Sequence, residues 1–167
     1  MKEEIVAILR TETDACVRFE MLENFYEAAD SEADILLLLS ILNNDEDPCV
    51  RHEAAAQLFR IEEKKSHLFS PMTKNMAIKS LFTRAKYDES VVVRHESIEA
   101  LGYLVDFDRL GCFDSFVQSE NLDIQSTAKI SAKVARYRIE KNIPASSIGA
   151  CFAKERTVPE LTKQSGV

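Results

Sequence analysis

The segment DPCVRHEAAAQLF (residues 47–59) recurs along the chain. A close copy, DESVVVRHESIEALG, spans residues 88–102, a weaker one, TDACVRFEML, spans residues 13–22, and a faint fourth, LDIQSTAKI, spans residues 122–130. Self-similarity with a period of roughly 20–50 residues is typical of stacked repeat proteins. The aliphatic anchors of the four copies lie at residues 17, 50, 93 and 124, which gives steps of 33, 43 and 31 residues.

Each copy has the pattern of an amphipathic helix with one apolar face. In the second copy Asp47 is placed to cap the helix, and Pro48 suits the first helical position, where its missing N–H is not needed. Apolar residues then recur at the spacing of one helix face, so we expect that face to be buried. The inward-facing residues are Val50, Ala54, Ala55 and Leu58 in the second copy, and Val93, Ser97, Ile98 and Leu101 in the third.

Helical periodicity covers most of the chain, and no segment alternates polar and apolar residues as a half-buried strand does. We expect continuous helices over residues 14–29 and 107–119, among others. Each helix pair has an apolar side that only a neighbouring pair can cover. The sequence therefore predicts an all-α solenoid with repeat units at about 1–30, 31–64, 70–105 and 106–141, a capping helix at 144–155 and a C-terminal tail at 157–167.

The repeated pattern resembles a known repeat class. The arrangement Asp-(x)n-Val-Arg-x-Glu-Ala-Ala-x-x-Leu-Gly is similar to the HEAT-like repeat of the phycobilisome-lyase type, and this resemblance covers most of the chain. It implies an α-solenoid of about four HEAT-like helix pairs, in which the second helix of each pair lines a concave surface. The two Val-Arg-His-Glu copies also resemble, over two short segments, deoxyhypusine hydroxylase, a HEAT-repeat enzyme family whose His-Glu pairs hold a di-iron centre.

Composition excludes several classes of function. The 167 residues carry a net charge of −7, whereas nucleic-acid binders usually show clustered Lys and Arg and a basic balance. The longest apolar run, residues 35–39, is far too short to cross a membrane. The charged N-terminal residues do not have the pattern of a signal peptide. We therefore expect a cytoplasmic protein that binds neither nucleic acid nor membrane.

The helix face opposite the buried anchors is the candidate binding surface. If the anchors point inward, the residues between them point outward along one strip that carries carboxylates, two imidazoles and a few aromatic rings. An acidic groove of this kind favours a protein or peptide partner with basic residues. We therefore expect a non-enzymatic adaptor or scaffold without a cofactor. The predicted partner-binding residues are Phe19, Glu20, Glu23, His52, Glu53, Gln57, His95, Glu96, Glu99 and Tyr103.

A metal site is the alternative interpretation of the same strip. His52 and His95 occupy equivalent positions on helices expected to pack about 8–10 Å apart, with Glu53 and Glu96 beside them. Two imidazoles and a carboxylate suit iron or zinc. The resemblance to the hydroxylase family implies four His-Glu pairs, and this chain has two, so a hydroxylase-like activity would need a homodimer. In the simpler interpretation, these residues fill a solvent-facing position that many residue types would satisfy.

Two further sets of basic residues recur. Arg18, Arg51 and Arg94 follow the anchors, and we expect each to pair with an acidic residue of the preceding turn, namely Asp14, Asp47 and Glu89. Such pairs would join neighbouring repeats and serve stability. Residues 122–141 are predicted to form a helix with a basic outer face, which is either a partner patch or a solvated surface. The residues of that face are Lys129, Lys133, Arg136, Arg138 and Lys141.

Overall fold

The computed structural model describes residues 2–145, and this part of the chain is helical throughout, with no strand. No helix in this range is long and apolar enough to pass through a bilayer. Of the predicted capping helix at 144–155, only residues 144 and 145 belong to the described range, and the predicted tail at 157–167 lies outside it. The elements are α1 (Lys2–Thr11), α2 (Ala15–Leu22), α3 (Phe25–Ala28), α4 (Glu32–Asn44), α5 (Pro48–Lys65), η1 (Ser66–Leu68), α6 (Pro71–Tyr87), α7 (Val91–Leu104), η2 (Phe107–Phe113), α8 (Asp114–Val117) and α9 (Leu122–Glu140).

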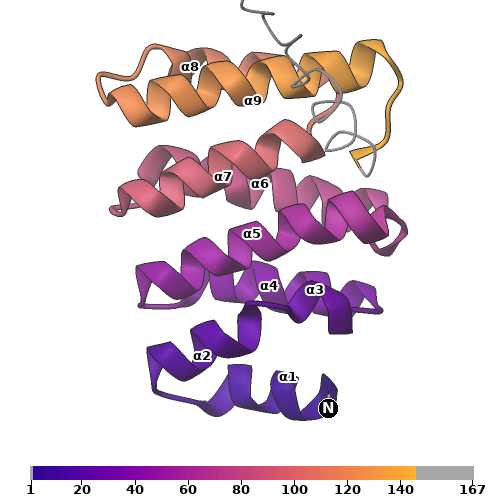
Figure 1. Cartoon of the computed structure of the whole chain (residues 1–167), viewed down its shortest axis with the longest axis vertical. Coiled ribbons are helices and arrows are strands. Elements are labelled where there is room, and N and C mark those ends of the chain that lie inside the picture. Colours follow the sequence, from indigo (N-terminus) through magenta and orange to yellow (C-terminus); the bar gives the residue numbers. More distant parts are fainter. Residues whose placement is uncertain (1, 146–167) are drawn as a thin grey trace, which may run out of the picture.

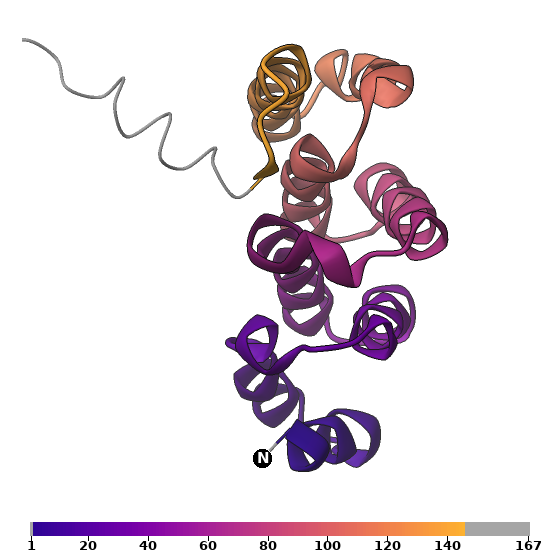
Figure 2. The ribbon, with the colours of Figure 1, turned by 90° about the vertical axis from the view of Figure 1, so that its right-hand side faces the viewer.

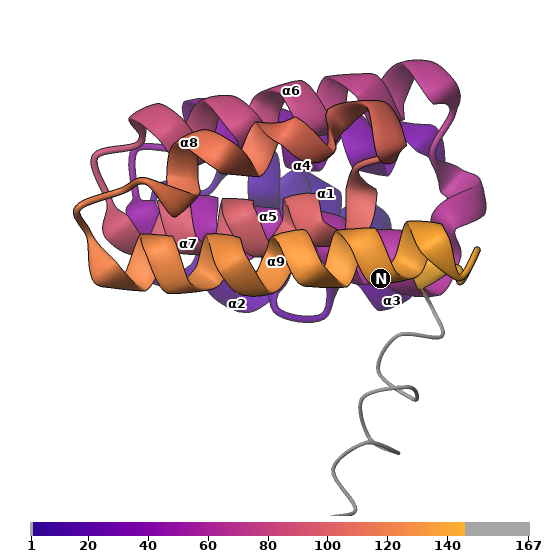
Figure 3. The ribbon, with the colours of Figure 1, turned by 90° about the horizontal axis from the view of Figure 1, so that it is seen from above.

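The helices lie one above another in chain order (Figure 1), and a perpendicular view separates them into two columns (Figure 2). One column contains α1, α4, α6 and the η2–α8 segment, and the other contains α2 and α3, α5, α7 and α9. The view from above shows α4, α6 and α8 on one side and α5, α7 and α9 on the other (Figure 3). Consecutive members of the second column pack directly on one another, α2 on α5, α5 on α7 and α7 on α9. The four copies of the repeated segment therefore lie side by side.

Local sequence signals set where these helices begin. The Asp47 carboxylate accepts hydrogen bonds from the N–H groups of Cys49 and Val50 at 2.8 and 3.2 Å, and Pro48 occupies the first turn. Asn121 caps α9 in the same way, through the N–H groups of Asp123 and Ile124. Such caps satisfy backbone donors that have no partner within the helix.

The predicted anchors Val50, Val93 and Ile124 lie in the core between the columns, whereas Val17 of the first copy is only partly buried. Every inward-facing residue expected in the second and third copies is buried, which confirms the helical register read from the sequence. Helices α7 and α9 approach each other closely at Gly102, where a Cβ would lie 3.1 Å from the Ser131 carbonyl oxygen and 3.3 Å from the Ser131 Cα. Glycine at this position therefore allows the backbones of α7 and α9 to approach each other.

The continuous helix predicted over residues 14–29 is wrong, because the segment breaks at Glu23 and Asn24 between α2 and α3. The side chain of Gln57 on α5 reaches into this break. Its Nε2 donates to the Glu23 carbonyl at 3.0 Å, and its Oε1 accepts from the Tyr26 N–H at 2.8 Å. The amide thus supplies the hydrogen bonds that the interrupted helix has lost.

The helix predicted over residues 107–119 also differs from the structure. Residues Phe107–Phe113 form a 3₁₀ segment, and only Asp114–Val117 form an α-helical turn. Phe113 and Phe116 are nevertheless buried, and the Phe116 ring lies 5.5 Å from that of Phe82 on α6. The segment therefore packs its apolar side chains on the core with a different backbone conformation from the predicted helix.

The recurring arginines join successive copies, but through partners other than those predicted. Arg18 binds Asp45 with an Nη2–Oδ1 distance of 2.7 Å, and Arg51 binds Asp88 at 2.8 Å. Each carboxylate belongs to the turn before the next copy. The predicted partners Asp14 and Asp47 instead accept hydrogen bonds from the first turns of their own helices. Arg94 has no ion pair with Glu89 or with any other carboxylate in residues 2–145.

The predicted basic face of α9 is only partly correct. Lys129, Lys133 and Arg136 are exposed on the helix, and Lys141 is exposed just beyond its end. Arg138 instead turns toward α7 and donates to the Val105 carbonyl, and burial lowers the pKa of its guanidinium. It therefore helps to hold α9 on the stack and does not belong to the outer face.

Candidate functional site

A hollow of about 480 Å³ lies on the column formed by α5, α7 and α9. Each helix supplies part of its lining, so it exists only because three copies are stacked. The two imidazoles that the sequence singled out, His52 and His95, both line it. The other lining residues are Val91, Val92, Asp123, Ser126, Thr127 and Ile130.

The first imidazole is joined to the next copy. His52 Nε2 on α5 lies 3.3 Å from Glu96 Oε2 on α7. This interaction with Glu96 raises the pKa of His52 above its usual value, although partial burial acts in the opposite direction. The charged form of the imidazole is therefore favoured by the neighbouring carboxylate. The structure brings together two predicted site residues from different copies.

The second imidazole is joined to the fourth copy. His95 Nδ1 lies 2.9 Å from the Thr127 hydroxyl on α9, and its Nε2 lies 3.6 Å from Glu99 on its own helix. The Thr127 hydroxyl also donates to the Asp123 carbonyl at 2.8 Å, so it accepts from His95. This leaves the His95 Nδ1 as the donor in that contact.

Glu99 and Tyr103 continue the same face of α7. Burial, and then the nearby charge of Glu96, raise the pKa of Glu99. The Tyr103 ring packs against Phe59 on α5, with 4.2 Å between ring centroids, and burial raises the pKa of its hydroxyl. The predicted strip therefore exists along α7, but its residues are half-buried between neighbouring helices.

The prediction that Glu53 and Gln57 face outward is wrong, because both are buried. Glu53 accepts from Gln57 Nε2 at 2.6 Å and from Arg60 Nη1 at 2.8 Å. Gln57 is fully buried because its amide fills the break between α2 and α3. Gln57 therefore connects α5 to the segment between α2 and α3, and Glu53 is held by two side chains of its own helix, so neither side chain points out to a partner.

The first copy contributes little to the hollow. Phe19 is half-buried and packs on the hydrophobic core, whereas Glu20 and Glu23 are exposed on α2 and at its C-terminal end. None of the three lines the hollow. The predicted strip is thus divided between an acidic edge on α2 and the hollow between α5 and α9.

The side chains proposed as metal ligands do not fit a metal centre. Between residues 2 and 145, no group of three or more His, Cys, Asp or Glu side chains is arranged to hold an ion. Glu53 points inward, and His52 and Glu96 contact each other. The expected set of two imidazoles and a carboxylate around one point is therefore not assembled.

Two apolar contributors were missed from the sequence. Val91 and Val92, at the start of α7, line the hollow, and the Val92 side chain is 52% exposed. The sequence does distinguish these two residues, because the third copy has three consecutive valines where each of the other copies has a single aliphatic anchor. Only Val93 is needed for the core, which leaves the first two valines for the surface.

Two comparisons with known proteins found no relative. No protein-family model matches the chain. A search of curated proteins also returned no match to its sequence.

Proposed function

We propose that the protein is a protein-binding module built from HEAT-like helix pairs, and that it takes an extended segment of another protein in the hollow between α5 and α9. The pairs would be α1–α2, α4–α5, α6–α7 and α8–α9. Three observations support the solenoid interpretation: the spacing of the copies, the packing of α2, α5, α7 and α9, and the two Arg–Asp pairs at equivalent positions.

The exposed apolar side chains in the hollow carry this proposal. Ile130 is 63% exposed and Val92 is 52% exposed, and both lie beside imidazoles that are already held by hydrogen bonds. Burying a side chain of this size is worth roughly 1.5–3 kcal/mol. An aliphatic or aromatic side chain of the partner would fill the hollow and gain this energy.

The charges around the hollow indicate which residues the partner segment carries beside its apolar one. Asp123 lines the hollow, Glu96 and Glu99 lie next to it on α7, and the chain as a whole has a net charge of −7. Complementary charge speeds encounter and selects among partners. The expected partner segment therefore carries Lys or Arg beside its apolar residue, and the expected role is that of an adaptor without catalytic activity.

Selection from a random peptide library on the full chain tests the proposal. Enriched peptides should pair an apolar residue with Lys or Arg, and their affinity should be measured by fluorescence anisotropy. Ile130→Asp should weaken binding at least tenfold. Leu122→Asp is the matched control, because Leu122 is 72% exposed on the same helix but does not line the hollow. Equal loss in both variants, or enrichment of acidic peptides, would refute the proposal.

A further inference from the structure

The two Arg–Asp pairs follow one geometric rule. The aspartates Asp45 and Asp88 each stand five residues before the anchor of the next copy, Val50 or Val93. Each aspartate accepts from the backbone N–H two residues later, at 2.9 and 3.0 Å, and also binds the arginine of the previous copy. One carboxylate therefore both shapes the turn and joins two copies.

The third junction keeps only half of this arrangement. Five residues before the anchor Ile124 stands Ser119. Its Oγ accepts from the Asn121 N–H at 3.2 Å, which is the same turn bond. A neutral hydroxyl cannot form an ion pair with an arginine. Arg94 of the previous copy therefore has no carboxylate at the position where Arg18 and Arg51 each have one.

Arg94 is correspondingly short of partners. Its Nη1 contacts the Asp88 carbonyl at 3.5 Å, which matches the 3.0 Å contact of Arg51 with the Asp45 carbonyl. Its Nε is buried and has no hydrogen-bond partner in the part of the chain that the structure describes. In Arg18 and Arg51 this same atom donates to the aspartate, at 2.8 and 3.0 Å. A buried donor left without an acceptor is destabilising, so an acceptor that reaches this position would bind favourably.

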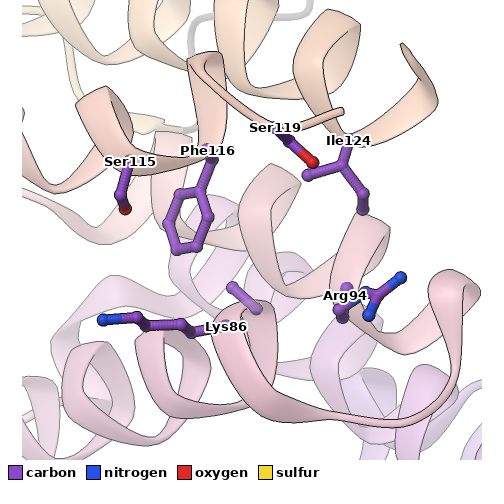
Figure 4. A pocket seen from close by; sticks show the side chains of 7 residues that line it. Lys86, Arg94, Ser115, Phe116, Ser119 and Ile124 are labelled. Carbon is purple, nitrogen blue, oxygen red and sulfur yellow. The ribbon is translucent and has the colours of Figure 1, made fainter. Parts of the chain in front are cut away.

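A cavity of about 210 Å³ lies at this position, between α6, α7, α8 and the start of α9. Figure 4 shows Lys86 and Arg94 on one side of it and Ser115, Phe116 and Ser119 on the other. The Lys86 ammonium lies over the Tyr87 ring, 5.2 Å from its centroid, so Lys86 lines the cavity with its aliphatic stem. The cavity therefore presents one guanidinium and two hydroxyl groups beside an apolar ring. Donors of this kind are those that bind oxyanions, and a guanidinium matches a carboxylate with two parallel hydrogen bonds.

We propose that this cavity binds a carboxylate group of a ligand, which takes the place that Asp45 and Asp88 occupy at the other two junctions. The guanidinium of Arg94 donates to the ligand, and the hydroxyl groups of Ser115 and Ser119 complete the site. No lining residue is shared with the hollow around His52 and His95, so either site can fail without affecting the other proposal.

The test follows the Nε–H group of Arg94 by NMR in the full chain labelled with ¹⁵N-arginine. Sodium acetate, succinate and phosphate are each titrated against sodium chloride at equal ionic strength. The Arg94 signal, assigned as the peak that Arg94→Lys removes, should shift saturably with acetate and succinate but not with chloride. An equal response to chloride, no response, or a response to phosphate alone would overturn the assignment to a carboxylate.

Two variants and a peptide complete the test. Ser119→Asp restores the carboxylate within the chain, keeps the turn bond to Asn121, and should abolish acetate binding while raising the melting temperature. Ser115→Ala, on an exposed residue that lines the cavity, should weaken acetate binding several-fold without unfolding the protein. Saturable binding that persists unchanged in Ser119→Asp would contradict the proposal. Tighter binding of a blocked Gly-Glu-Gly peptide than of acetate would assign the carboxylate to a polypeptide, and equal binding would assign it to a small anion.

Discussion

Arg51 and Asp88 form a bidentate ion pair between α5 and the turn before α7. The Arg51 Nε and Nη2 atoms donate to the two Asp88 carboxylate oxygens at 3.0 and 2.8 Å. The Asp88 side chain is fully buried, and Arg51 is 7% exposed. Because the Arg51 Nη1 also donates to the carbonyls of Asp45 and Glu46, one side chain fixes two consecutive turns.

Removing the charge of Asp88 should therefore be costly. We expect Asp88→Asn to lower the free energy of unfolding by about 3 kcal/mol, because it leaves the guanidinium of Arg51 buried without its carboxylate. Urea denaturation measures this. The matched control is Glu89→Gln, because that side chain is 83% exposed and lies 3.6 Å from the same arginine. Its effect should stay below about 0.5 kcal/mol. Equal effects of the two variants would show that the buried Arg51–Asp88 pair contributes no more to stability than the exposed Glu89.

The pKa of His52 should depend on Glu96. In NMR titrations His52 should titrate above its ordinary value of about 6.5, and Glu96→Gln should lower its pKa. Because the pKa is raised on folding, the stability from this pair is fully present below about pH 6.5 and is lost as the pH rises through the folded-state pKa. Glu99→Gln is the control, since Glu99 contacts His95 and not His52. A His52 pKa that does not respond to Glu96→Gln would contradict this coupling.

Removing the side-chain amide of Gln57 should destabilise the protein strongly, although the group is uncharged. Replacing Gln57 by leucine keeps the volume but leaves the Glu23 carbonyl and the Tyr26 N–H without the bonds that the amide now makes. We expect a loss of about 2–4 kcal/mol and faster hydrogen exchange at Tyr26. Gln118→Leu, on an exposed residue, serves as the control. Unchanged exchange at Tyr26 would show that Gln57 does not hold the break between α2 and α3.

Gly102 should not tolerate a methyl group. Alanine would bring Cβ to 3.1 Å from the Ser131 carbonyl oxygen, and main-chain atoms cannot move aside as a flexible side chain would. The overpacking cost of about 1–3 kcal/mol outweighs the gain in helix propensity of about 1 kcal/mol, so thermal denaturation should show a net loss. Gly111→Ala should be nearly neutral, because its nearest neighbour is the Asp114 carboxylate at 3.9 Å. A stabilising Gly102→Ala would mean that α9 can move away freely.

The sequence predicted the buried residues better than the exposed ones. Spacing identifies which face of a helix is apolar, and every expected anchor of the second and third copies is buried. It cannot show that the Gln57 amide bonds to the backbone between α2 and α3, or that Glu53 is buried beneath Gln57 and Arg60 of its own helix, which is why both were placed outside. The register correctly put the His-Glu doublets on adjacent helices, but His52 contacts Glu96 rather than meeting His95 at one point, and His95 contacts Thr127.

The arginine partners show the same limit. Sequence proximity favoured Asp14 and Asp47, yet these carboxylates cap their own helices. The true partners lie 27 and 37 residues away, and only the stacking of copies brings them close. The 3₁₀ conformation of residues 107–113 was equally hard to predict, because the buried rings of Phe113 and, in α8, Phe116 have a spacing that also fits an ordinary helix.

The Arg–Asp pairs all run in one direction along the stack, because Arg18 and Arg51 each bind an aspartate in the turn before the next helix of the same column. The third junction has Ser119 in place of the aspartate, so the series of Arg–Asp pairs does not continue from the third copy to the fourth. We therefore expect the last of the three arginine junctions to open most readily, and local unfolding to begin where α9 packs on α7. A molecule that supplies the missing carboxylate would hold α9 on α7, so that its binding would be detected as increased rigidity of α9.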